Sequence, residues 1–76
     1  MIKIGEFRRK DEVVFTIRQC YGECYCFINP ELEISDLERV LLRDLFELIH
    51  HSCLSVAELK EKTKYYINDY HFVWEV

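Results

Sequence analysis

Glycine and proline are scarce in this chain, with two Gly and one Pro among 76 residues. The sequence contains neither Gly-x-Gly-x-x-Gly nor Gly-x4-Gly-Lys-Ser/Thr, which excludes the common backbone loops that hold nucleotide phosphates. A disordered or low-complexity segment is also excluded, because half of the residues are hydrophobic and 14% are aromatic. Since so short a chain is below the usual size of two domains, the composition predicts one folded domain over residues 1–76.

The sequence also lacks a long apolar run and an excess of positive charge. No stretch approaches the roughly 20 apolar residues of a membrane-spanning helix, and the N-terminus has no apolar signal-peptide core. We therefore expect a cytoplasmic protein without a membrane span. The net charge is −4, from 10 Lys and Arg against 14 Asp and Glu, whereas phosphate binding needs a concentrated positive field. The charge disfavours nucleic acid as a partner.

The first third of the chain has the pattern of β-strands. Three β-rich runs contain Ile2 and Ile4, residues 13–20, and residues 24–28. The basic run Arg8-Arg9-Lys10 is expected at a solvated hairpin tip rather than at a phosphate site. Gly22 permits the positive φ that a second tight turn requires, and Pro30 ends the third run because it removes a ladder donor. These features predict a small antiparallel β-meander of about three strands.

Two capping boxes mark the starts of two helices. In each box a serine oxygen can accept from the amide of a glutamate, whose side chain reaches back, and the pairs are Ser35 with Glu38 and Ser55 with Glu58. The first helix is expected over residues 36–51 and the second as far as Tyr70. The remaining tail fits either more helix or a strand that joins the sheet. The predicted fold is α+β, with an N-terminal antiparallel meander packed against two C-terminal helices.

The first helix carries more apolar residues than one core contact requires. They fill an arc of roughly 240°, whereas a helix that packs on one core needs little more than 100°. Leu42, Phe46 and Ile49 form one edge of this arc, and we expect them at an interface with a protein partner or in a homodimer. The alternative is that the C-terminal tail folds back over them. On the narrow polar face, Arg43 and Glu47 are spaced for an ion pair.

Thiol and imidazole groups form the one cluster with metal-ligand chemistry. The cysteines are Cys20, Cys24, Cys26 and Cys53. With His50 and His51 they have the ligand types that zinc prefers, but their spacing is unlike that of zinc knuckles. Small apolar core residues and a disulfide are the alternatives, and we favour core residues, hence no metal and no cofactor. No nucleophile, base and carboxylate constellation is present, so we do not expect an enzyme.

Nucleic-acid binding remains a further hypothesis. Residues 54–59 look like the opening phrase of a winged helix, but the would-be recognition segment, residues 65–70, has no Arg or Lys. Aromatic side chains such as Tyr25 and Phe27 could stack bases on a sheet. Because they lack interleaved basic residues in the sequence, we assign them to core and interface packing.

Several short motifs follow one another in a recognisable order. Phe27-Ile28-Asn29-Pro30-Glu31-Leu32 precedes the acidic start of the leucine-rich helix, and Tyr65-Tyr66-Ile67-Asn68-Asp69 comes later. In this order the motifs resemble the N-terminal, non-catalytic region of archaeal type II/IV secretion and archaellum-type motor ATPases. The resemblance spans most of the chain and implies a detached docking or regulatory domain. The sequence has one proline where that family often has two, and it contains no P-loop.

The leading functional hypothesis is therefore a small protein-interaction module that acts through an apolar helix surface. A Cys/His metal-binding or redox-linked domain is the second hypothesis, and a winged-helix-like nucleic-acid binder is the third. The bound metal, the affinity for a DNA duplex and the oligomeric state are the properties that distinguish them.

Overall fold

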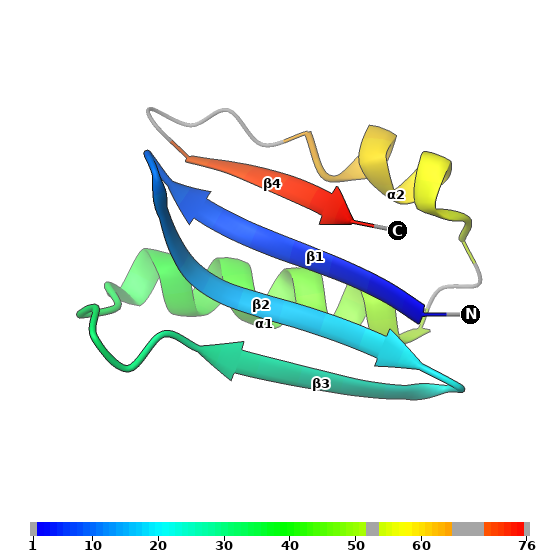
Figure 1. Cartoon of the computed structure of the whole chain (residues 1–76), viewed down its shortest axis with the longest axis horizontal. Coiled ribbons are helices and arrows are strands. Elements are labelled where there is room, and N and C mark those ends of the chain that lie inside the picture. The colour runs from blue at the N-terminus through cyan, green and yellow to red at the C-terminus, as the bar shows by residue number, and fades with distance from the viewer. Residues whose placement is uncertain (1, 52–53, 65–69, 76) are drawn as a thin grey trace.

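The computed structural model describes residues 2–51, 54–64 and 70–75. The elements in chain order are β1 (Ile2–Arg9), β2 (Glu12–Cys20), β3 (Glu23–Ile28), α1 (Asp36–His51), α2 (Val56–Lys62) and β4 (Tyr70–Glu75). The strands form one antiparallel sheet in the order β3-β2-β1-β4. Helix α1 lies behind β2 and β3, and α2 lies beside β4 (Figure 1). The fold is α+β, as the sequence predicts.

The core lies on one face of the sheet. Because side chains alternate across a strand, Phe7 of β1 and Phe15 and Ile17 of β2 point to the same side. Their partners in the core are Leu45 and Ile49 from α1, Leu59 from α2 and Trp74 from β4. The rings of Phe7 and Phe15 stack with centroids 4.8 Å apart. This helix-facing side therefore supplies the apolar contact that holds the sheet and both helices together.

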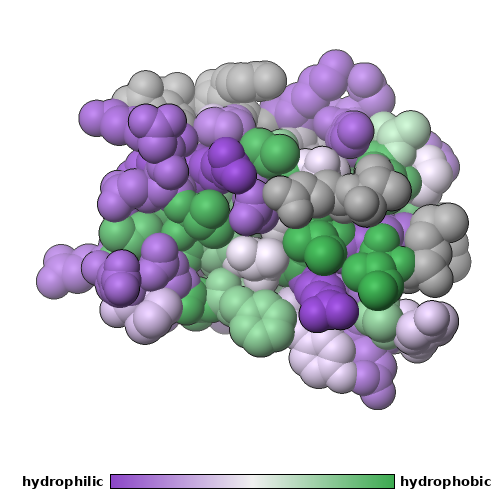
Figure 2. All heavy atoms as spheres, viewed as in Figure 1, coloured by the Kyte–Doolittle hydropathy of each residue, from purple (hydrophilic) through white to green (hydrophobic). Residues whose placement is uncertain are grey.

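The opposite side of the sheet, which we call the open face, carries mixed side chains. Ladder positions assigned to it from the strand registers are Ile4, Glu6, Thr16, Arg18, Cys20, Tyr25, Phe27, His71 and Val73. Phe27 is 57% exposed and Tyr25 is 46% exposed. Figure 2 is drawn from this side and shows hydrophobic patches interrupted by hydrophilic ones. The open face is thus a mosaic and lacks the continuous apolar surface of a second core.

Strand β4 corrects the expected end of the second helix. Helix α2 ends at Lys62, and Tyr70 already belongs to β4 and pairs with β1, so the prediction of helix as far as Tyr70 is wrong. The tail instead forms the strand that was the alternative, while residues 65–69 lie outside the described residues. Trp74 is 7% exposed, and its Nε1 donates to Thr63 Oγ1 at 2.8 Å. Pairing with β1 buries this large ring, which favours the strand.

Glu38 joins the start of α1 to the first hairpin. Its carboxylate accepts from the Ser35 amide at 2.8 Å, and its own amide donates to Ser35 Oγ at 3.2 Å, which confirms the first capping box. Arg9 Nη1 also donates to this carboxylate, at 3.2 Å from Oε2. Glu38 is fully buried. The expectation of a solvated hairpin tip is therefore wrong for Arg9, which lies within β1 and pairs with a buried charge.

The second capping box is confirmed at the start of α2. The Glu58 amide donates to Ser55 Oγ at 3.2 Å, and the Ser55 amide donates back to Glu58 Oε1 at 3.2 Å. Unlike the first box, this one is exposed. Within the part of the chain that the structure describes, neither helix has the length and apolar character needed to cross a membrane.

Gly5 permits two aromatic rings of β4 to approach β1. A Cβ atom at this position would lie 2.5 Å from Phe72 Cε1 and 3.2 Å from Trp74 Cζ3. We expect Gly5→Ala to lower the free energy of unfolding by about 1–3 kcal/mol, because the rings must shift within a packed site. Urea unfolding measures the effect. The double variant Gly5→Ala with Phe72→Leu should recover part of the loss, and an unchanged urea midpoint for Gly5→Ala alone contradicts the predicted clash.

Candidate functional site

The three residues predicted at an interface lie in different environments. Ile49 is fully buried in the core beside Leu45, so its prediction as a surface residue is wrong. Leu42 and Phe46 are half-buried and line a groove between α1 and β3. Ile49 is buried because it lies, with Leu45, on the side of α1 that packs against the sheet. Leu42 and Phe46 lie beside this contact. The C-terminal tail does not cover them, because β4 lies at the opposite edge of the sheet.

This groove, which we call the edge groove, encloses about 490 Å³. Its lining residues are Cys26 and Ile28 from β3, and Arg39, Leu42, Arg43, Phe46 and Glu47 from α1. Helix α1 begins at the end of the sheet where β3 ends, and it runs back along β3 in the opposite direction (Figure 1). The apolar side chains therefore come from both elements, and the charged side chains all come from α1.

Strand β3 is an edge strand whose outer backbone groups border the edge groove. The Asn29 amide donates to the Val14 carbonyl at 3.0 Å, which sets the alternation along the β2–β3 ladder. By this alternation the backbone groups of Tyr25 and Phe27 face β2. The residues whose amides and carbonyls point outward are Cys24, Cys26 and Ile28. In the described ranges no strand pairs with this outer side of β3.

The two edges of the sheet differ in their protection against strand pairing. At the β4 edge, Lys60 and Lys64 line a hollow together with Phe72 and Trp74. Lysine side chains near an edge strand oppose the approach of another strand. Residues 24–28 of β3 include no charged residue and no proline. Within the strand itself the β3 edge is thus free of charge over residues 24–28, and the charged residues beside it, Arg39, Arg43 and Glu47, all belong to α1.

The charges along the edge groove are not balanced. Arg39 and Arg43 are exposed and one helical turn apart, and neither forms an ion pair with another described residue. Glu47 Oε2 lies 3.0 Å from His51 Nε2, a contact that is an ion pair only with a protonated imidazole, and the predicted ion pair of Arg43 with Glu47 is not observed. The rim of the groove therefore carries two arginines whose donors are available to a ligand.

The cysteines do not come together as one cluster. Cys24 and Cys26 are half-buried on the helix-facing side, whereas Cys20 lies on the open face, and Cys53 is outside the described residues. Burial raises the pKa of the Cys24 and Cys26 thiols. A raised thiol pKa disfavours the thiolate that zinc binding and disulfide exchange require. Among the residues that the structure describes, no three Cys, His, Asp or Glu side chains form a group suited to a metal ion.

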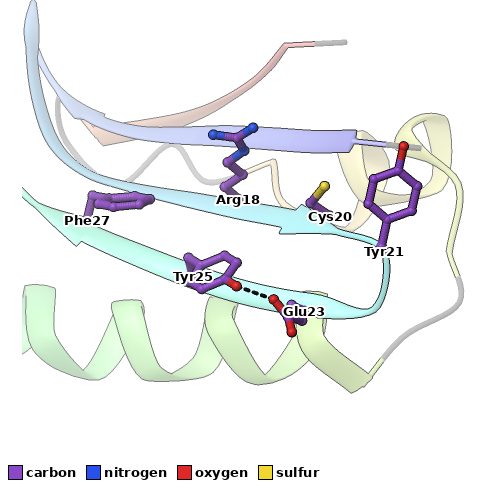
Figure 3. Close-up of a pocket in the computed structure, with 6 residues that line it drawn as sticks. All are labelled: Arg18, Cys20, Tyr21, Glu23, Tyr25 and Phe27. Atoms are coloured by element: carbon purple, nitrogen blue, oxygen red, sulfur yellow. Dashed lines mark hydrogen bonds between the residues drawn. The ribbon is translucent and has the colours of Figure 1, made fainter.

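A shallow pocket of about 440 Å³ lies on the open face over β2 and β3. Figure 3 shows its lining residues, with Arg18 across from Tyr25 and with Phe27 and Tyr21 toward opposite ends. The Tyr25 hydroxyl donates to the Glu23 carboxylate, and this contact raises the pKa of Tyr25. The structure thus places one basic residue among the aromatic rings, which the sequence pattern did not reveal. A carboxylate in the same pocket opposes phosphate binding.

Sequence reasoning found one wall of the edge groove and missed the other. Leu42 and Phe46 followed from the helical periodicity. Cys26 and Ile28 were assigned to a strand, but nothing local to the sequence shows that this strand lies at an edge beside α1. The alternation of residues 24, 26 and 28 on one face was the available signal.

Comparisons of the chain with protein-family models, with curated proteins and with solved structures found no match. The resemblance to secretion ATPases and the expectation that the chain is not an enzyme therefore stay predictions.

Proposed function

We propose that this protein is an interaction domain that binds an extended segment of a partner protein as an additional strand beside β3. Strand addition needs a row of unpaired backbone groups for affinity and pockets for alternate side chains for specificity. The observation that carries the proposal is that both features lie together. Cys26 and Ile28 direct their backbone groups outward and their side chains into the edge groove.

The added strand would place every second side chain toward α1. Neighbouring strands lie about 4.8 Å apart, so the new strand extends the sheet directly past β3. Its side chains on the helix-facing side then meet Leu42 and Phe46, whose half-buried surfaces become covered. Such a domain fits the docking or regulatory role that the resemblance to the ATPase N-terminal region implies. The apolar helix surface of the leading hypothesis becomes one wall of a two-walled site.

The substitution Cys26→Pro tests this proposal, because it changes a backbone amide that faces away from β2. The Cys26 amide points away from β2, so Cys26→Pro should keep the β2–β3 ladder and the circular dichroism spectrum of the folded domain. The variant removes the backbone N–H that would donate to an added strand, and it places the proline ring where that strand would pair. We expect its affinity for a fluorescein-labelled peptide that alternates valine with serine to fall by about tenfold, because lost hydrogen bonds contribute about 0.5–1.5 kcal/mol each. Fluorescence anisotropy measures the affinity.

The matched control is Cys26→Val, which keeps the outward amide and an apolar groove wall. Its affinity for the same peptide should stay close to that of the parent. Amide hydrogen exchange locates the bound peptide: the amides of Cys24, Cys26 and Ile28 should exchange more slowly when it is added. Equal binding by a folded Cys26→Pro variant, or slower exchange at β4 instead, contradicts strand addition at β3.

A further inference from the structure

The chain as a whole is acidic, but the edge groove has the opposite local charge. The net charge is −4, yet the rim of the groove contains Arg39 and Arg43 without a carboxylate partner among the described residues. The acidic residue of the rim, Glu47, contacts His51 at 3.0 Å, and the two arginines outnumber it. A ligand in this groove therefore meets a positive potential that the composition of the chain conceals.

The charge is also placed toward one end of the groove. Helix α1 runs opposite to β3 (Figure 1). From their positions in α1, Arg39 therefore lies toward the end of β3 at Ile28, and Glu47 lies toward its beginning. Leu42 and Phe46 contribute the apolar contact between these ends. A bound strand thus encounters Arg39 and Arg43 on either side of Leu42, and then Phe46 and Glu47.

We infer that the partner segment is acidic and has a defined pattern, an inference that rests on the proposed function. A carboxylate side chain meets Arg39 and Arg43 near Ile28. An apolar side chain two residues further along the segment covers Leu42 and Phe46. Guanidinium groups recognise carboxylates through charge-assisted and often bidentate hydrogen bonds, which gives the segment both a preferred sequence and a preferred direction. In an antiparallel addition, the carboxylate lies on the N-terminal side of the apolar residue.

A second copy of this chain fits the groove less well. Its β3 strand would present Cys24, Cys26 and Ile28 on the helix-facing side, and none of these side chains carries a carboxylate. A two-fold arrangement of β3 strands would also bring two identical arginine rims toward each other. The charge of the groove therefore favours an acidic segment of another protein.

The inference is tested with three peptides that differ at one position. Each is the labelled peptide of alternating valine and serine, with its first valine replaced by glutamate, glutamine or lysine. We expect the glutamate peptide to bind the parent about tenfold more tightly than the lysine peptide, with glutamine between them, because the two arginines attract a carboxylate and repel an ammonium group. The difference should shrink as salt is raised. In the double variant Arg39→Glu with Arg43→Glu, the order of the three peptides should reverse.

The matched control is Arg18→Glu on the open face, which changes the net charge in the same sense and should leave the order of the peptides unchanged. Equal affinities for the three peptides, all accompanied by slowed exchange at Cys26 and Ile28, overturn the acidic pattern and leave strand addition intact. If no peptide slows these amides, the proposed function fails together with the inference. A parent that dimerises in light scattering, with these amides protected before any peptide is added, identifies a second copy as the occupant and overturns the inference.

Discussion

Phe7→Ala should lower the free energy of unfolding by about 4 kcal/mol, the largest loss that we expect from a single core substitution here. Phe7 is fully buried in β1, a central strand, and its ring stacks on Phe15 at 4.8 Å and on Tyr70 at 5.4 Å. Removing it leaves a cavity between three strands that cannot close without moving the ladder. Because stability amounts to about 0.05–0.15 kcal/mol per residue, this loss is between about a third and all of the stability of so short a chain.

Two further variants keep this prediction measurable. Phe7→Leu retains most of the apolar volume and should stay folded with an intermediate loss, which urea unfolding can quantify. Phe27→Ala removes the same ring from the open face, where it is 57% exposed, and should reduce the stability by less than about 1 kcal/mol. If the two alanine variants lose equal stability, the open face is part of a core and the assignment of the two faces is incorrect.

Glu38→Ala should reduce the stability by about 2–3 kcal/mol, less than the 3–5 kcal/mol of a fully buried broken pair. The lower value is expected because Arg9 is partly exposed, at 29%, and can reach water when its partner is lost. Three contacts disappear together: the return bond from the Ser35 amide and the two contacts from Arg9. Thermal or urea unfolding measures the change.

Glu58→Ala provides the matched control for Glu38→Ala. Glu58 accepts from the Ser55 amide in an equivalent capping box, but it is exposed and has no ion pair with a described arginine. Its removal should cost about 0.5–1 kcal/mol, the range of an exposed cap. Similar losses for the two glutamate variants contradict the special role of the contact between α1 and the first hairpin.

Local signals in the sequence predicted the elements that local chemistry determines. Both capping boxes involve residues three apart, and the turn between β2 and β3 has a positive φ at two adjacent residues, 51° at Tyr21 and 84° at Gly22. The α+β fold class followed from the order of these elements. The end of the second helix could not be predicted in this way. Tyr70 is a strand residue because it pairs with β1, which is far away in sequence.

Only the part of the candidate site that depends on local sequence was predicted. Helical periodicity identifies Leu42, Phe46 and Ile49 as neighbours, but it does not say which of them faces the sheet. A small rotation of the helix about its axis exchanges a buried position for a groove position. The packing of α1 against β2 and β3 determines this rotation. The partner strand β3 and the rim arginines entered the site only through tertiary structure.

The single tryptophan gives the domain an intrinsic optical reporter. Trp74 is 7% exposed, donates to Thr63 Oγ1 and lies with its ring centroid 5.0 Å from that of Phe72. It belongs to β4, which β1 and β2 separate from β3 in the sheet. Its emission spectrum therefore follows the docking of β4 and α2 during denaturation, while a segment bound at β3 leaves its surroundings in place. Unfolding can be monitored through this fluorophore with ligand present, without a label on the protein.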